Sequence, residues 1–101
     1  MSKIEFHPDA QSDLESARSW YRERSQLAAR AFVMEVHRAL QSIAISPDAW
    51  PRTRANERRF VLKRFPYSII YRVRENEVFI TAGAHHRRLP GYWSGRNSSQ
   101  L

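Results

Sequence analysis

A change of hydrophobic period halfway along the chain is the feature that most limits its possible folds. Between residues 8 and 43, apolar side chains recur every three or four positions, as on one face of an α-helix. From residue 59 onward they alternate with polar ones, as in strands with one buried face. We therefore expect an α+β fold, in which a helical layer covers a sheet.

The helical part divides into two helices that a short link joins into a hairpin. The first is expected over residues 8–23, because its leading proline suits the first helical turn, where no N–H is needed. Ser25 suits the N-cap of the second helix, and Ser46-Pro47 ends it. A short strand, Lys3–Phe6, is expected ahead of both helices. The apolar stripe of the second helix consists of Ala29, Phe32, Val36, Leu40 and Ile43.

Three strands are expected in the second half of the chain, after a loop over residues 48–57. They cover residues 59–63, Tyr67–Arg74 and Val78–Ala84, and the mostly apolar last strand is expected to be a more central strand. The order β-α-α-β-β-β predicts a three-stranded antiparallel meander with the helices on one face of the sheet. The other sheet face is expected to be open and basic.

One domain over residues 1–93 accounts for these elements, and the polar residues 94–101 are expected to form a flexible tail. The chain has no cysteine, which excludes disulfides and thiolate metal sites, and its histidines lack metal-ligand spacing. We expect neither a metal nor a cofactor. The longest apolar run is short, at Ala31–Met34, and no signal-like segment opens the chain, so a cytoplasmic protein without a membrane partner is expected.

Charge is segregated between the two halves of the chain. Residues 1–50 hold six Lys/Arg against seven Asp/Glu, a net charge of −1. Residues 51–101 hold eleven against three, a net charge of +8. Because most of the basic residues are arginines, which bind phosphate and carboxylate bidentately, an anionic partner is favoured, either a nucleic acid or an acidic polypeptide. A preference for arginine codons would explain the composition but not the segregation.

The alternation of the strands gathers part of this charge on one face. Arg59, Lys63, Arg72 and Arg74 are expected there, on the side away from the helices. They form either a surface for a nucleic acid or protein partner, or simply a solvated sheet face. Tyr67 and Tyr71 are expected on the opposite, helix-facing side, where core packing is the more common role.

Three stretches of the chain together resemble the RelE/ParE superfamily of bacterial toxins. They are the helix start Pro8-Asp-Ala-Gln-Ser-Asp-Leu14, the stretch Arg64-Phe-Pro-Tyr-Ser-Ile-Ile-Tyr-Arg-Val73, and the ending His85-His-Arg-Arg-Leu-Pro-Gly-Tyr-Trp93. The resemblance implies the toxin of a type II toxin–antitoxin pair, neutralised by a cognate antitoxin and reaching operator DNA only through it. Antitoxin tails in this superfamily are typically acidic, which fits the basic second half.

The superfamily has two activities, and the residues favour one of them. RelE-like members cut messenger RNA on the ribosome, whereas ParE-like members inhibit DNA gyrase. Ser68 stands where the best-known cutting members have an arginine, and Val61 interrupts the basic residues of its strand. Arg88 and Tyr92 do match the basic and tyrosine positions near the C-terminus. Gyrase inhibition is therefore favoured, with ribosome-dependent RNA cleavage as the alternative.

A metal-independent nuclease would need a base, an acid and a cation at the scissile phosphate. His85 or His86 could supply the base or acid, Arg88 the cation, and Tyr92 a proton or a stacking surface, while Trp93 could stack on a partner. Alternatively, one histidine hydrogen-bonds a loop, and Tyr92 and Trp93 pack the tail onto the sheet. Neighbours on a strand point to opposite faces, so at most one histidine should face the open side. An acidic partner is expected on the sheet face and tail, or else in an apolar groove between the helices.

Overall fold

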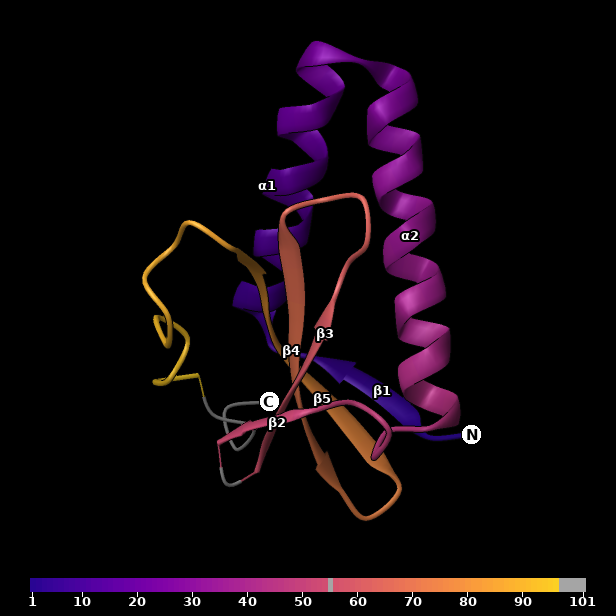
Figure 1. Ribbon diagram of the computed structural model, residues 1–101, viewed down its shortest axis with the longest axis vertical. Helices are drawn as coiled ribbons and strands as arrows, with labels where there is room; N and C mark the ends of the chain where they lie inside the picture. Colours follow the sequence, from indigo (N-terminus) through magenta and orange to yellow (C-terminus); the bar gives the residue numbers. More distant parts are fainter. Residues whose placement is uncertain (55, 97–101) are drawn as a thin grey trace.

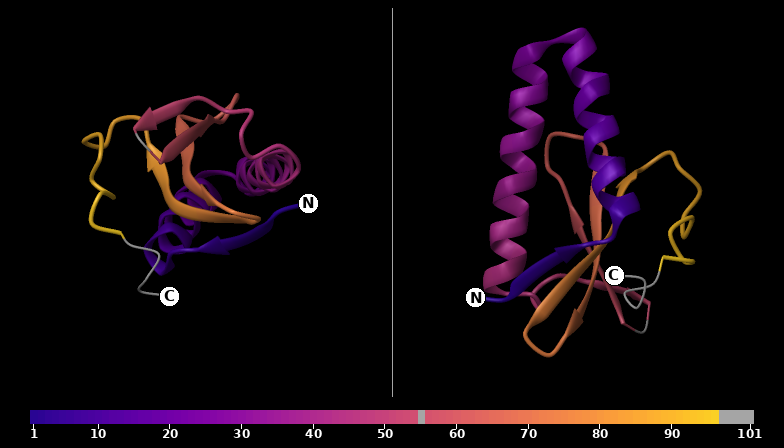
Figure 2. Two further views of the ribbon diagram at one scale, coloured as in Figure 1. Left: turned by 90° about the horizontal axis from the view of Figure 1, so that it is seen from below. Right: turned by 180° about the vertical axis from the view of Figure 1, so that it is seen from behind.

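A helical hairpin and a five-stranded sheet form the fold (Figure 1). The computed structural model describes residues 1–54 and 56–96. Strand β1 leads into two long helices, and four strands follow them. The bounds are β1 Lys3–Phe6, α1 Pro8–Arg24, α2 Gln26–Ile45, β2 Arg52–Arg54, β3 Glu57–Val61, β4 Tyr67–Arg74 and β5 Glu77–His85. Figure 2 shows both helices on one side of the sheet, which confirms the α+β expectation.

The sheet order is β1-β5-β4-β3-β2. Strands β3, β4 and β5 form the expected antiparallel meander, and β5 is an interior strand between β1 and β4. The sheet is mixed, because β1 pairs with β5 in parallel at one edge, a pairing that the sequence did not predict. The sequence also missed β2, a strand that lies inside the expected loop and pairs with β3. All three β2 residues are exposed, so they carry no hydrophobic alternation that could reveal a strand.

Both helices begin where side chains cap them. Ser25 Oγ accepts a hydrogen bond from the N–H of Ala28 at 3.2 Å, which confirms the predicted start of α2. At α1, the Nδ1 atom of His7 accepts from the N–H of Asp9 at 3.0 Å, and Pro8 follows as the first helical residue. The N-cap role of His7 was not foreseen.

The main core lies between the helical hairpin and the sheet. Phe32 and Ile43 of α2 meet Ile69, Tyr71 and Ile80 of the sheet, and each of these side chains is almost fully buried. The predicted helix-facing position of the β4 tyrosines is confirmed. The Tyr71 hydroxyl donates to the carbonyl of residue 47 at 2.7 Å, and burial raises its pKa to about 12.

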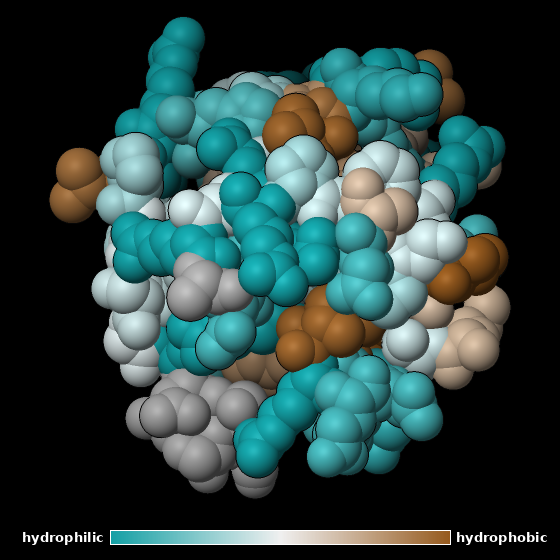
Figure 3. Space-filling model, turned by 60° about the horizontal axis from the view of Figure 1, so that its bottom comes forward, coloured by the Kyte–Doolittle hydropathy of each residue, from teal (hydrophilic) through white to brown (hydrophobic). Residues whose placement is uncertain are grey.

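A second, smaller core covers part of the opposite sheet face. Ile70, Ala82 and Ala84 are buried there under Trp93, with Tyr92 at the margin. The expectation of a wholly open face was therefore wrong, because the apolar residues of this face need a cover and the C-terminal segment, residues 86–96, supplies it. Figure 3 shows that the end of the molecule opposite the helical turn is covered mainly by hydrophilic side chains. None of the helices within residues 1–54 and 56–96 has the length and apolar character that a membrane crossing needs.

Candidate functional site

A bulge in β5 decides which way the C-terminal residues of that strand point. Ile70 pairs with Ala82, but the next residue of β4, Tyr71, pairs with Ile80. Thr81 is thus left without a partner in β4, as in a β-bulge, where one strand contains an extra residue. Such an insertion reverses the facing of every later residue in the strand.

Beyond the bulge, the two adjacent histidines diverge. Ala84 packs in the far-face core, His85 lines a cleft beside α1, and His86 hydrogen-bonds Ser68 on the far face. The expectation that neighbouring histidines would face opposite sides is confirmed. The sequence could not show which one would reach which face, because no residue type marks Thr81 as the extra residue.

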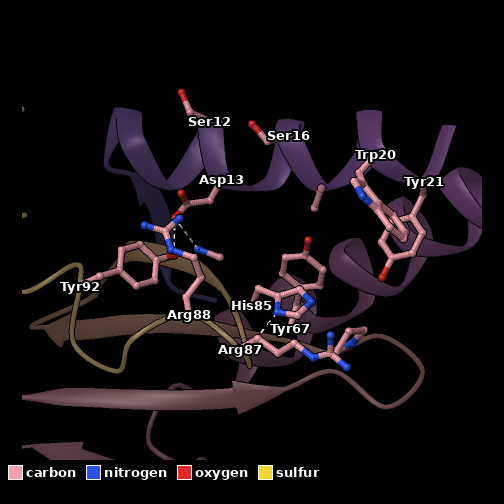
Figure 4. Close-up of a pocket in the computed structure, with 13 residues that line it drawn as sticks. Ser12, Asp13, Ser16, Trp20, Tyr21, Tyr67, His85, Arg87, Arg88 and Tyr92 are labelled. Carbon is pink, nitrogen blue, oxygen red and sulfur yellow. Dashed lines mark hydrogen bonds between the residues drawn. The ribbon is translucent and has the colours of Figure 1, made fainter. Parts of the chain in front are cut away.

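The cleft between α1 and the end of β5 has a volume of about 570 Å³ (Figure 4). It gathers three of the four residues predicted for catalysis, namely His85, Arg88 and Tyr92. His86 is not among its lining residues. The other side chains that line it come from α1, from the start of β4 and from the segment after β5: Ser12, Asp13, Ser16, Ala17, Trp20, Tyr21, Pro66, Tyr67, Gly83 and Arg87.

Asp13 organises one end of this cleft. Its Oδ2 atom accepts hydrogen bonds from the N–H of Gly83 at 3.1 Å, the Tyr92 hydroxyl at 3.1 Å and Arg96 Nη1 at 2.7 Å. Burial, and then the Asp13 carboxylate, raise the pKa of Tyr92 to about 12. The Tyr92 hydroxyl is therefore a protonated donor to Asp13 and is poorly placed to give its proton to a ligand.

Arg88 and His85 stand farther along the same cleft. The guanidinium carbon of Arg88 lies 3.8 Å from the centre of the Tyr92 ring, a cation–π contact. The Nδ1 atom of His85 accepts from the N–H of Arg87 at 3.0 Å, and its ring meets the Tyr67 ring edge-on at 4.9 Å. These contacts leave Nε2 as the His85 nitrogen that can meet a ligand.

On the far face, Ser68 links two predicted site residues. Its buried Oγ accepts from Arg59 Nε at 2.9 Å and lies 2.9 Å from His86 Nε2. Burial, and then the Arg59 charge, lower the pKa of His86. Neutral imidazole can accept the Ser68 hydroxyl proton, so Arg59, Ser68 and His86 form a hydrogen-bonded chain.

Trp93 packs the C-terminal segment onto the sheet and is not free to stack on a partner. Only 8% of it is exposed, and its Nε1 donates to Glu57 Oε1 at 2.8 Å. Glu57 is buried as well and also accepts from Thr53 Oγ1 at 2.6 Å. This pair fixes the C-terminal segment to β3, and nothing in the sequence linked these positions.

Three of the four predicted basic residues lie along the far side of the sheet, and the fourth, Lys63, lies outside the strands. Arg59 in β3 and Arg72 and Arg74 in β4 keep the expected alternation. Lys63 lies beyond the end of β3, where its N–H donates to the Glu35 carboxylate of α2. Burial tends to raise the Glu35 pKa, but hydrogen bonds from the N–H groups of residues 64 and 63 outweigh it and leave that pKa lowered.

Sequence reasoning also missed two anchors of the C-terminal segment. Asp13 was seen only as part of a helix start, yet it joins α1 to β5 and to Arg96. Arg96 additionally donates to the carbonyl of Thr81 at 3.0 Å, within the stretch expected to be a tail. Residues 97–101 of that tail lie outside the described residues. Asp13 and Arg96 are 83 positions apart, so no local sequence pattern indicates their ion pair.

An N-terminal helical hairpin on a small sheet, with a basic second half, is what the resemblance to the RelE/ParE superfamily implies. A family model described as "ParE toxin of type II toxin-antitoxin system, parDE" matches residues 4–90. The chain therefore belongs to the ParE toxin family and is the toxin of a type II toxin–antitoxin system, whose partner is a cognate antitoxin.

The solved structures agree with this family at the level of the fold. The chain is similar to a structure titled "Chromosomal ParDE TA system from P. aeruginosa", with a TM-score of 0.72 and 19% sequence identity. The similarity covers 84% of this chain and 96% of the other. Among curated proteins, no sequence matches the chain.

Proposed function

We propose that this toxin arrests growth by binding DNA gyrase in the cytoplasm, and not by cutting messenger RNA. The observation that carries the proposal is the division of the predicted acid–base cluster between two faces of the sheet. His85 lines the α1 cleft, whereas His86 is bonded to Ser68 on the far face. Membership of the ParE family supports the same choice.

The polar atoms of the cluster are also engaged within the protein. The Tyr92 hydroxyl donates to Asp13, and the Arg88 guanidinium lies on the Tyr92 ring. A general acid must reach the leaving group, and a phosphate-binding cation must reach the phosphate. A toxin that acts by binding needs neither group. The far-face arginines Arg59, Arg72 and Arg74 would form the surface of the toxin that binds gyrase.

Ribosome-dependent RNA cleavage is the second candidate, and one observation favours it. His85, Arg88 and Tyr92 do line a single cleft, together with Tyr67. In this mechanism, which uses no metal, His85 would transfer a proton and Arg88 would leave the tyrosine ring to hold the phosphate. Both steps require the cleft residues to rearrange on the ribosome.

The two candidates separate in a paired assay of the purified toxin. We expect inhibition of DNA supercoiling by purified gyrase and no codon-spaced cuts in a message translated in a cell extract. Arg72→Ala/Arg74→Ala should weaken gyrase inhibition, whereas His85→Ala should leave it intact. Normal supercoiling combined with message cleavage that His85→Ala abolishes would refute the proposal and establish the nuclease.

A further inference from the structure

The cleft between α1 and β5 holds side chains that gyrase binding does not use. Its volume, about 570 Å³, lies within the range of roughly 300–1,000 Å³ that is usual for small-molecule sites. Residues of α1 form one of its walls, whereas the arginines that we assign to gyrase lie on the far face of the sheet. The cleft is therefore separate from that surface, and its side chains determine which ligand it can hold.

Donors for an anion lie on the wall opposite α1 (Figure 4). Arg87 is exposed, and across residues 1–54 and 56–96 its guanidinium group makes no hydrogen bond and no ion pair. The Nδ1 atom of His85 accepts from the N–H of Arg87, so the proton of the neutral ring is on Nε2, which is a donor. Arg88, stacked on a tyrosine ring, adds positive charge nearby. An arginine and an imidazole donor together match a phosphate group.

Aromatic rings line the same cleft. Trp20 and Tyr21 come from α1 and Tyr67 from β4. The centre of the Tyr21 ring lies 5.0 Å from that of Trp20 and 6.4 Å from that of Tyr67. Trp20 remains 50% exposed although the Arg24 guanidinium lies over its ring. Part of the indole surface is thus available to a planar ligand, and stacking on aromatic side chains is how many proteins hold nucleic-acid bases.

Two tyrosine hydroxyls add polar groups to this aromatic part. Burial is the largest cause that raises the pKa of both Tyr21 and Tyr67, so both hydroxyls are protonated near neutral pH. In the part of the chain that the structure describes, neither hydroxyl has a hydrogen-bond partner. Each is therefore able to donate a hydrogen bond to a ligand and to accept others, as a sugar hydroxyl or the edge of a base requires.

A ligand needs both an anionic and a planar part to use all of these groups. Inorganic phosphate would meet the donors but leave the rings uncovered, and an apolar aromatic compound would do the reverse. A nucleoside phosphate has both parts. A free nucleotide fits better than a longer strand, because the donors at the other end of the cleft are already bound to Asp13, and the next phosphate of a strand would meet that carboxylate.

We propose that the cleft between α1 and β5 binds a free nucleoside phosphate. The base lies against Trp20, and the phosphates lie between Arg87 and the Nε2 atom of His85. Binding is reversible, and no bond is formed or broken. The toxin then carries two separate sites, because the arginines that we assign to gyrase face the other side of the sheet.

Calorimetry with ADP, adenosine and pyrophosphate as probes tests the proposal. We expect ADP to bind the purified toxin with a dissociation constant below about 1 mM and more tightly than either fragment, since each fragment uses only half of the site. Arg87→Ala and Trp20→Ala should each weaken ADP binding by about tenfold, the usual size of a lost phosphate contact or stacked base. Arg52→Ala is the matched control, because it removes the same charge from the exposed strand β2. Trp20→Phe should retain most of the affinity, because it keeps an aromatic ring.

The indole N–H signals in nuclear magnetic resonance spectra locate the bound ADP. ADP should shift the signal of Trp20 and leave that of Trp93 unchanged, because Trp93 is buried on the far face and bonded to Glu57. Without ADP, each variant should show the same Trp93 signal as the unaltered toxin, which confirms that it is folded. Because these measurements contain no gyrase, failure of the gyrase proposal would not affect them.

Four results would overturn the proposal. The first is the absence of ADP binding at about 1 mM. The second is pyrophosphate binding as tight as that of ADP, which would mean a site for anions alone. The third is an equal loss in Arg87→Ala and Arg52→Ala, which would mean a general charge effect. The fourth is a short single-stranded RNA that displaces ADP and binds far more tightly, which would assign the cleft to a nucleic-acid strand.

Discussion

Single charged residues tie segments together that are distant in the sequence. Asp13 accepts hydrogen bonds from β5, from Tyr92 and from Arg96. In the sequence, this residue lies near the start of the first helix, far from all three donors. Glu57 does the same for Trp93 and Thr53. The sequence correctly located the start of the first helix at Pro8 and the aromatic pair Tyr92 and Trp93 near the C-terminus. It could not connect them, since a side-chain bond between such distant positions depends on the complete fold.

Replacing the Asp13 carboxylate should loosen this connection. Asp13→Asn keeps the shape but removes the charge that offsets Arg96, whose side chain is only 15% exposed. Hydrogen bonds to charged groups typically contribute about 1.5–3 kcal/mol, so we expect the free energy of unfolding in urea to fall by about that amount. Asp9→Asn is the control, because Asp9 is 64% exposed and lies 3.8 Å from the Arg96 Nε atom. Equal losses in the two variants would contradict a special role for Asp13.

His86 should make the stability of the fold depend on pH. Its pKa in the folded protein is lowered from 6.5, first by burial and then by the Arg59 charge. As the pH falls below 6.5, the unfolded chain therefore binds a proton before the folded protein does. The His86 contribution is complete above that pH and declines as the pH falls toward the folded pKa.

The measurement is the urea midpoint on each side of this range, for the unaltered toxin and for His86→Gln. The glutamine can still bond the Ser68 hydroxyl but does not titrate in this range. We expect the acid-induced loss of stability to be smaller in His86→Gln. An identical loss in both proteins would show that His86 does not contribute to it.

At the scale of elements, the sequence predicted the helices well and the sheet less completely. Periodicity located α1, α2, β3 and β4, and the mostly apolar run of β5 indicated an interior strand. It missed β2, which buries nothing, and the parallel pairing of β1, which depends on the path of the chain. It also missed the bulge at Thr81, so it predicted that the two histidines would face opposite sides but not which side each would face.

Glycine at position 83 leaves room for the Leu14 side chain of α1 to pack against β5. A β-carbon there would lie 2.5 Å from Leu14 Cδ2, which is closer than van der Waals contact permits. Overpacking of this kind typically costs about 1–3 kcal/mol, so Gly83→Ala should lower the thermal midpoint. Adding Leu14→Ala should recover part of the loss, since it removes the atoms that clash. If the thermal midpoint of the double variant falls by the sum of the two single decreases, the clash with Leu14 is not the cause of the Gly83→Ala effect.

The C-terminal segment should depend on Trp93. This side chain covers Ile70, Ala82 and Ala84 and bonds Glu57. Large-to-small changes at buried aromatic residues cost about 3–5 kcal/mol, and Trp93→Ala should fall near that range. Hydrogen exchange should accelerate at residues 86–96 more than in α2. Uniform acceleration throughout the protein would instead indicate that the segment and the core unfold together.

For the whole molecule, basic residues are divided between the far sheet face and the helical hairpin. The far sheet face carries Arg59, Arg72 and Arg74, and the exposed surface of the hairpin carries Arg18, Arg22 and Arg30. The net charge of the second half, +8, adds a long-range field that attracts any acidic partner before contact. Close contacts in the complex and the overall field should therefore affect different steps of antitoxin binding.

The salt dependence of the association and dissociation rates tests this division. Raising ionic strength from about 0.01 M to about 0.15 M shortens the Debye length from about 30 Å to about 8 Å. Steering by the whole field should weaken accordingly, so the association rate constant should fall by about tenfold or more. The dissociation rate constant, set by close contacts, should change little. In stopped-flow measurements, Arg52→Glu/Arg54→Glu, which reverses two charges on the exposed strand β2, should lower the association rate constant alone. A salt-independent association rate constant would show that the overall field does not steer the antitoxin.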